Sequence, residues 1–268
     1  MDLQQRSILL TGGGSGIGAS LALRLATHAA RLTLVGRHEG PLEEVAAAVR
    51  AAGGEAQVVT ADLTEAGAPA RIVEAAVEHF GGLDVLVNNA GNVRAGRLER
   101  ISEEEVLAQV ALNVTAPILV TRAALGALRA SGDGLVVNVS SAIALVGMPF
   151  YTVYAATKAG VAHFGEALRR ELDGEGVRVL TVYPGATRTA MMKTSKAGPE
   201  HGFDYESPDA VAQAVLEAMI DERLSVIRGG ETRSRMIAMN RDDPAAVDRM
   251  LAERKDALEE AVAGHSSL

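Results

Sequence analysis

Tyr154 and Lys158 place a phenol and an ammonium four residues apart in the stretch YTVYAATKAG, residues 151–160. On a helix, residues four apart lie on one face, about one turn from each other. A phenol titrates at about pH 10, and a nearby cation stabilises the phenolate and lowers that pKa. The pair could therefore donate or accept a proton during hydride transfer at a carbonyl carbon. Tyr151 lies a further turn back and does not share this spacing.

A glycine-rich turn near the N-terminus is the second candidate for chemistry. Gly12, Gly16 and Gly18 lie between the apolar run SILLT (7–11) and a helical pattern that starts at residue 16. Glycine permits positive φ angles and a close backbone approach, and the helix N-terminus beyond favours a pyrophosphate. The spacing, Gly-x-x-x-Gly-x-Gly, is wider than Gly-x-Gly-x-x-Gly, and no Gly-Lys-Ser/Thr of a P-loop follows. A purely structural turn is the alternative, but the strand before and the helix after favour dinucleotide binding.

The end of the second apolar run bears on the choice of dinucleotide. An acidic residue there would accept hydrogen bonds from the adenosine ribose and select NAD. The run ends in LVGRH, where Gly36 offers no carboxylate and Arg37 offers a forked cation suited to a 2′-phosphate. A solvated surface arginine is the other interpretation of Arg37. We expect NADP (NADPH) as the preferred cofactor, with NAD as the alternative.

A regular alternation of strands and helices must position these residues. Near-continuous apolar runs predict strands of a sheet covered on both faces, and helical patterns between them predict parallel crossovers. The strand-like runs are at 7–11, 31–36, 56–61, 83–89, 134–140, 177–183 and 224–229, and the helical patterns are at 16–28, 41–52, 65–80, 103–130, 154–173 and 208–221. Ser102 with Glu105 predicts a capping box at the start of the fourth helix. We expect one α/β domain over residues 1–268, a doubly wound Rossmann-type parallel β-sheet of about seven strands flanked by helices on both faces.

Two segments depart from this alternation. Residues 187–206 show no clean period, and an irregular stretch of this length in a compact domain is commonly a functional loop. We expect it to form a lid over the substrate. Residues 243–262 are charged, and their apolar residues follow a helical spacing, which predicts a C-terminal helical tail.

Composition excludes several classes of function. The chain has 26 Lys plus Arg against 34 Asp plus Glu, a net charge of −8, so we expect no nucleic-acid partner. It has no cysteine, which excludes disulfides and thiolate metal sites. The six histidines are scattered without metal-ligand spacing, and we expect no metal. The N-terminal stretch lacks the features of a signal peptide, and no window approaches 18 uninterrupted apolar residues, so we expect a cytoplasmic protein with no membrane partner.

Taken together, the motifs resemble those of the short-chain dehydrogenase/reductase family in its single-domain branch. The matching segments occur in family order over residues 5–230: TGGGSGIG (11–18), ADL (61–63), NNAG (88–91), Asn113, NVSS (138–141), YAATK (154–158) and PGATRT (184–189). The joint match is specific, whereas a lone Tyr-x-x-x-Lys spacing is not.

The resemblance implies roles for individual residues. Ser141 is similar to the family serine that hydrogen-bonds the substrate oxygen, Tyr154 to the acid/base, and Lys158 to the lysine that lowers the phenol pKa and holds the nicotinamide ribose. Asn113 resembles the residue that anchors a proton-relay water. The implied cofactor-binding residues are Gly12, Gly14, Ser15, Gly16, Ile17, Gly18, Arg37, Asp62, Leu63, Asn89, Ala90, Gly91, Tyr154, Lys158, Pro184, Gly185, Thr187 and Thr189.

The chain also departs from the family pattern. Many members that use NADP carry a basic residue where this chain has Ser15, and many close with a TG…DGG segment that is replaced here by RGGETRSRMIAMNRDD. The second departure bears on assembly, where a homodimer through the helices at 103–130 and 154–173 or a homotetramer is expected.

Three classes of function remain. The first, which we favour, is an NADP-dependent alcohol dehydrogenase or ketoreductase acting on a small-molecule carbonyl or alcohol substrate. The second is a cofactor-binding sensor without chemistry, which would be expected to lose Ser141, Tyr154 or Lys158. The third is a nucleotide-sugar epimerase or dehydratase, which commonly has a tighter glycine motif and a larger C-terminal domain. All three side chains are intact here.

Overall fold

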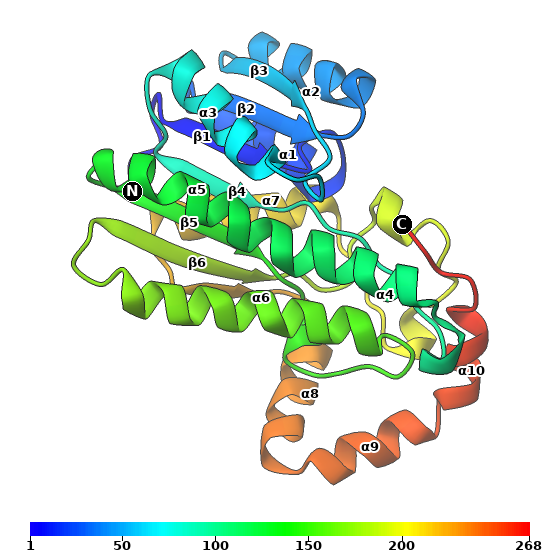
Figure 1. Ribbon diagram of the computed structural model, residues 1–268. Helices are drawn as coiled ribbons and strands as arrows, with labels where there is room; N and C mark the ends of the chain where they lie inside the picture. Colours follow the sequence, from blue (N-terminus) through cyan, green and yellow to red (C-terminus); the bar gives the residue numbers. More distant parts are fainter.

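A seven-stranded parallel sheet forms the centre of the computed structural model, which describes residues 1–268 (Figure 1). The strand order is β3-β2-β1-β4-β5-β6-β7, and every neighbouring pair is parallel. The strands are β1 (Ser7–Thr11), β2 (Arg31–Gly36), β3 (Glu55–Thr60), β4 (Val85–Asn88), β5 (Gly134–Val139), β6 (Val177–Tyr183) and β7 (Ser225–Ile227). The predicted doubly wound sheet of about seven strands is confirmed.

Helices cover both faces of the sheet. One layer contains α1 (Gly16–Ala26), α2 (Glu39–Ala51) and α7 (Pro208–Ile220), and the other contains α3 (Ala68–Phe80), α4 (Glu103–Val110), α5 (Ala116–Ala130) and α6 (Thr152–Glu171). Successive residues of β1 point to opposite faces, so Ile8 and Leu10 pack with α1 and Leu9 packs with α3. Both faces are buried, which explains why these strands are apolar throughout.

The strand order reverses between β1 and β4. β2 and β3 lie on one side of β1, whereas β4 to β7 lie on the other. Helices that follow neighbouring strands diverge at such a point and leave a crevice at the carboxyl ends of the strands. The glycine turn after β1 and the segments after β4, β5 and β6 all meet at this edge.

One long helix runs from residue 103 to residue 130, as predicted, but it is not uniform. Its first turn has the predicted capping box: the Glu105 amide donates to Ser102 Oγ at 3.2 Å, and the Ser102 amide donates to Glu105 Oε2 at 3.0 Å. A π-helical turn, Ala111–Thr115, separates α4 from α5 and contains Asn113. By length and composition alone this helix could cross a membrane; in the structure a third of its most apolar window is buried, and Val120 and Ala124 pack in the core.

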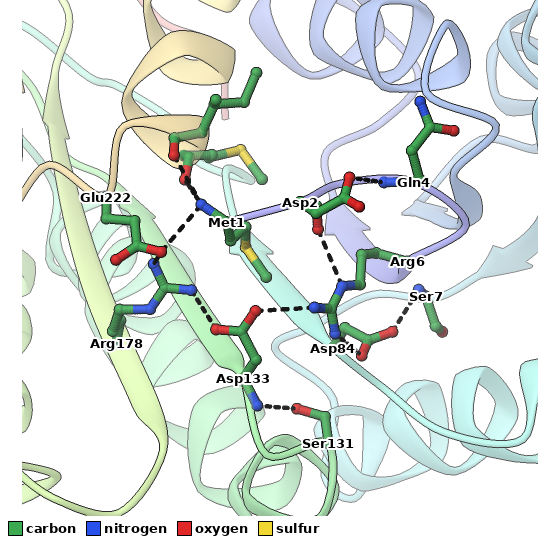
Figure 2. A network of polar contacts seen from close by, with 12 residues as sticks. Met1, Asp2, Gln4, Arg6, Ser7, Asp84, Ser131, Asp133, Arg178 and Glu222 are labelled. Carbon is green, nitrogen blue, oxygen red and sulfur yellow. Dashed lines mark hydrogen bonds and ion pairs between the residues drawn. The ribbon is translucent and has the colours of Figure 1, made fainter.

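Ion pairs tie together the opposite, amino-terminal end of the sheet (Figure 2). Arg6 Nη1 lies 2.9 Å from Asp84 and its Nη2 lies 2.8 Å from Asp133, while Arg178 pairs with Asp133 at 2.5 Å and with Glu222 at 2.8 Å. These side chains are partly exposed, so each pair contributes about 0–1 kcal/mol. The network holds the ends of β1, β4, β5 and β6 together at the end of the sheet that carries no candidate site.

The chain beyond β7 forms an arm. It consists of α8 (Gly230–Asp242), α9 (Pro244–Ala252) and α10 (Lys255–Ala261), and in Figure 1 it returns, in red, to the yellow segment after β6. The predicted tail at 243–262 is thus two short helices, and α8 was not predicted, because only two of its thirteen residues are buried and its pattern is weak. Residues 187–206 form no long element but contain two 3-10 turns, Ala190–Met192 and Pro199–His201.

Candidate functional site

A cavity of about 460 Å³ lies at the carboxyl ends of β1, β4, β5 and β6. It lies at the reversal of strand order, where open α/β sheets bind ligands. The predicted residues that line it are Gly12, Ser15, Gly16, Ile17, Arg37, Asn89, Ala90, Gly91, Ser141, Tyr154, Lys158, Pro184, Gly185, Thr187 and Thr189. The fold therefore brings together segments that are far apart in the sequence.

Tyr154 and Lys158 are held on one face of α6, as their spacing predicts. The Lys158 ammonium lies 5.7 Å from the centre of the Tyr154 ring and donates a hydrogen bond of 3.0 Å to the carbonyl of Val139, at the end of β5. Ser141 lies two residues beyond β5 and lines the same cavity, and its hydroxyl accepts from the Ile143 amide at 3.3 Å. Serine, tyrosine and lysine thus converge from a strand end and one helix.

Burial controls the ionisation of both α6 residues. It raises the pKa of Tyr154 to about 12, and the Ser141 hydroxyl offsets part of that rise. It lowers the pKa of Lys158 to about 8. The sequence predicts a Tyr154 pKa lowered by the lysine, and this prediction is wrong, because desolvation of the buried phenol is the larger cause and raises the pKa. At neutral pH the phenol is therefore protonated and can donate a proton.

Asn113 lies behind the cavity and does not line it. Its amide exchanges two hydrogen bonds of 2.9 Å with the backbone of Asn92 and donates to Thr157 Oγ1 at 3.2 Å. Thr157 in turn donates to the carbonyl of Tyr154 at 2.8 Å. A side chain at Gly91 would meet Asn113 Oδ1 at 3.0 Å and Lys158 Nζ at 3.3 Å, so both polar groups approach this glycine. The π-helical turn thereby connects the segment after β4 to α6.

The glycine turn has the shape that a dinucleotide needs. Gly12 and Gly16 have φ angles of 67° and 55°, and a side chain at Gly18 would lie 2.2 Å from the carbonyl oxygen of Gly12. No side chain caps the start of α1, because Ser15 makes no capping bond, which leaves its first amides available to an anion. Asn89 fixes the turn by donating to the carbonyls of Thr11 and Gly12 at 3.0 and 3.1 Å. These residues fit a bound pyrophosphate.

Arg37 and His38, which follow β2, both line the cavity. Asp62 accepts hydrogen bonds from the amide and hydroxyl of Thr64 at 2.9 and 2.7 Å, and these bonds, helped by the charge of Arg37, lower its pKa. Leu63 packs in the core with Leu9 and Val35 rather than in the cavity. Gly14, Gly18, Asp62, Leu63 and Asn113 are the predicted site residues that do not line the cavity.

The C-terminal arm adds residues that sequence reasoning did not assign to the site. His265 and Ser267 line the cavity, held by hydrogen bonds of 2.9 Å from the Ala95 amide to the His265 carbonyl and from the Ser267 amide to Val93. His265 is fully buried; burial, the larger cause, and the charge of Arg94 lower its pKa to about 4, so the ring is neutral at pH 7. Arg233 of α8 also lines the cavity. No local sequence signal marks these residues, since distant contacts place them there.

Phe203, Met191 and Met192, from the predicted lid, line the cavity as well. The lid segment is tied to the C-terminal arm through Thr194, whose hydroxyl lies 2.9 Å from His265 Nδ1, and through the Lys196 amide, which donates to Ala261 at 2.8 Å. The apolar part of the cavity is therefore enclosed by residues 187–206 and by the C-terminal arm, which are far apart in the sequence.

Comparison with known proteins agrees with this architecture. The sequence matches the short chain dehydrogenase family over residues 6–200. It is 32% identical over 254 residues to the ketoacyl reductase HetN of Nostoc sp., covering 92% of this chain and 88% of that protein. It is 40% identical over 181 residues to the 2,5-dichloro-2,5-cyclohexadiene-1,4-diol dehydrogenase LinX of Sphingobium indicum, covering 68% of this chain and 72% of that protein.

A solved structure is also similar. The crystal structure of a short chain dehydrogenase from Burkholderia cenocepacia in complex with NADP aligns with a TM-score of 0.76 at 33% identity, covering 87% of this chain and 94% of that one. The fold and the glycine turn define a nucleotide-binding protein of the Rossmann type. The chain belongs to the short-chain dehydrogenase/reductase family.

Proposed function

We propose that the protein transfers a hydride between a nicotinamide cofactor, preferably NADP, and a carbonyl or secondary alcohol substrate. The convergence of Ser141, Tyr154 and Lys158 on a cavity that also contains the glycine turn carries this proposal. Relatives named ketoacyl reductase and diol dehydrogenase support the reaction class, and the NADP bound to the Burkholderia protein supports the cofactor.

In this proposal the two hydroxyl groups act on one oxygen. The Ser141 and Tyr154 hydroxyls bind the substrate carbonyl oxygen, and Tyr154, protonated at neutral pH, donates its proton to the developing alkoxide. When bound, the nicotinamide supplies the hydride in reduction and accepts it in oxidation. Lys158 stabilises the phenolate that remains, and the bonds of Asn113 to Asn92 and Thr157 hold α6 in register with the segment after β4.

Lys158 is well placed for such a role. Its ammonium is held by a single hydrogen bond to a protein group, the carbonyl of Val139, although the side chain is only 4% exposed. An ammonium has three donors, so two remain for the cavity and its ligands. A cofactor ribose hydroxyl is the natural acceptor in the family arrangement proposed here.

We expect Arg37→Ala to weaken NADPH binding about ten- to a hundredfold, because one charge-assisted hydrogen bond to phosphate contributes roughly 1.5–3 kcal/mol. NADH binding should barely change, since NADH lacks the 2′-phosphate. Fluorescence titration of both cofactors against both proteins measures this. Arg50→Ala, on the exposed face of α2, is the matched charge control. Tighter binding of NADH than of NADPH by the parent protein would contradict the preference.

We also propose that residues 187–206 form a lid over the substrate. The exposed Arg188, Lys193 and Lys196 are trypsin sites within it, and Met191 and Phe203 line the cavity beneath. Loops that close over ligands come from the less stable part of a fold. Limited trypsin digestion should cut here first, and more slowly once NADPH and a substrate analogue are bound. Cleavage at equal rates with and without these ligands counts against a lid.

A non-catalytic sensor or a nucleotide-sugar enzyme would behave differently. The discriminating experiment supplies NADPH with a panel of carbonyl compounds, and NADP with alcohols, and follows the absorbance of the reduced nicotinamide. A sensor would bind cofactor without turnover, and an epimerase or dehydratase would leave the cofactor without net oxidation. Net hydride transfer to any member of the panel supports the proposed function.

A further inference from the structure

Besides Lys158, a second buried charge that lines the cavity, Arg233, has no partner of opposite sign. Arg233 is 9% exposed and forms no ion pair, and its one side-chain hydrogen bond runs from Nη1 to the thioether of Met236 at 3.7 Å. A thioether is a weak acceptor, so most of the five N–H donors of the guanidinium lack protein acceptors. Burial lowers the Arg233 pKa, and the nearby charge of the exposed Asp204 compensates only in part.

The other arginines of the same helix show the contrast. Arg235 pairs with Glu231 at 2.5 Å and Arg241 pairs with Asp242 at 2.7 Å, and both are at least 75% exposed. In α8, the two exposed arginines are therefore paired with carboxylates, whereas the buried Arg233, which lines the cavity, is not. A buried charge is costly unless it is paired, which points to a partner that the protein itself does not supply.

Arg233 lies near the turn after β6, whereas Arg37, the residue predicted to bind the adenosine phosphate, follows β2. Gly185, after β6, packs closely on Gly229, so that a side chain at Gly185 would meet the Gly229 Cα at 2.8 Å. A side chain at Gly229 would meet the Arg233 Cβ at 3.0 Å. This close packing seats the first turn of α8 against the Pro184-Gly185 turn, whereas Arg37 follows β2 on the other side of β1.

The surroundings of Arg233 are those of a substrate pocket. Met236, one turn on, packs in an apolar cluster with Phe203 and Tyr151. The Tyr151 ring lies 5.9 Å from that of Phe203 and 6.4 Å from that of Tyr154. The cavity thus combines these apolar side chains with Tyr154, the proposed proton donor, and with Arg233, whose guanidinium has no partner of opposite charge.

We propose that Arg233 binds a carboxylate of the substrate, which makes oxo acids and hydroxy acids the substrate class of this enzyme. The proposal rests on the hydride-transfer function proposed above. The planar fork of the guanidinium matches a carboxylate in two parallel hydrogen bonds, and in a dry site such bonds are strong. The carboxylate would anchor one end of the substrate and direct its carbonyl group toward Ser141 and Tyr154.

The test compares 2-, 3-, 4- and 5-oxo acids of six to ten carbons with their methyl esters, using NADPH as reductant. The parent protein should reduce at least one acid with a kcat/KM at least about tenfold above that of its ester, the effect of one charge-assisted contact. Arg233→Met should lower kcat/KM for that acid about ten- to a hundredfold and leave the ester unchanged. Arg235→Met, on the exposed face of the same helix, is the matched control and should change neither.

Two further measurements keep the outcome interpretable. NADPH affinity should be unchanged in Arg233→Met, and a loss of cofactor binding would assign the guanidinium to the cofactor and overturn the proposal. If Arg233→Met does not fold, Arg233→Lys, which keeps the charge but loses the fork, should reduce the preference for acid over ester. Equal kcat/KM for acids and esters in the parent protein also overturns it.

Failure of the proposed hydride transfer can be distinguished from failure of the proposed carboxylate binding by Arg233, which is called the anchor below. If neither this set nor the broader panel of carbonyl compounds and alcohols gives hydride transfer, the proposed function is contradicted, and binding of a carboxylate by Arg233 is then tested without turnover. Saturated carboxylates of the same lengths should raise the melting temperature of the parent protein, with their methyl esters as controls, and should not raise that of Arg233→Met. Equal shifts in both proteins, or none in the parent, contradict the anchor.

Discussion

Tyr154→Phe is expected to lower kcat by roughly two to four orders of magnitude, the range typical of lost acid/base catalysis. In the proposed reaction the phenol of Tyr154, which is protonated at neutral pH and lines the cavity from α6, is the proton donor. Tyr151, the other phenol that lines the cavity, does not stand four residues before Lys158. Phenylalanine keeps the ring and its packing and removes only the hydroxyl. Steady-state kinetics on a substrate found in the carbonyl screen measures the loss.

Tyr151→Phe is the matched control. Tyr151 has the same functional group, is 3% exposed and lies 6.4 Å from Tyr154 between ring centres. Tyr151 does not stand one turn before Lys158. Turnover of Tyr151→Phe should therefore stay within about tenfold of the parent, which corresponds to about 1.4 kcal/mol in the activation free energy. NADPH affinity should be retained in both variants. Comparable activity in the two variants would mean that the assignment of the proton donor is wrong.

Lys158→Met is expected to cost about two to three orders of magnitude in kcat, as for the loss of one preorganised group that stabilises developing charge. Methionine has a similar length and fills the space without the ammonium. The variant loses the charge over the Tyr154 ring and the hydrogen bond to Val139. Lys255→Met, on the exposed surface of α10, removes the same charge and should leave kcat unchanged. Near-parent turnover by Lys158→Met would contradict the role of the lysine.

The same variant has an expected signature in stability. Burial lowers the Lys158 pKa from 10.5 to about 8, so between these values the unfolded chain holds a proton that the folded chain has lost. The free energy of unfolding therefore rises as the pH rises from about 8 to 10.5. The same gain is lost as the pH falls back through this window to the folded-state pKa of about 8. Between about pH 7 and about pH 9.5, the free energy of unfolding of the parent should gain about 2 kcal/mol relative to Lys158→Met. Urea unfolding of both proteins at the two pH values measures this.

The pH window ends at about 9.5 because the ionisation of Tyr154 lowers the free energy of unfolding at higher pH, whereas that of Lys158 raises it. Its pKa is raised from 10.0 to about 12, so the unfolded chain ionises first and stability falls as pH rises above 10. Below that value only the lysine contributes among the pair. A difference between parent and Lys158→Met that does not change with pH would mean that the ammonium is not desolvated in the folded protein.

The sequence by itself determined the layered fold and one face of the site. Continuous apolar runs separated by helical patterns predict a sheet buried on both faces, and all seven strands form where expected. The spacing of Tyr154 and Lys158 predicts a shared helix face, and the glycines predict a turn without room for side chains, as at Gly18. These features are local, since they depend on residues within one or two turns of each other.

Only the tertiary structure decided the rest of the cavity and the ionisation of its groups. Arg233, His265 and Ser267 reach the cavity because α8 packs on the Gly185 turn and the last residues bond to Val93 and Ala95, contacts between segments about 45 to 170 residues apart. The pKa of Tyr154 rises rather than falls because desolvation depends on everything packed around the phenol, not on the lysine spacing. Local spacing can place two side chains on one face, but the enclosure that excludes water arises only when distant segments close over them.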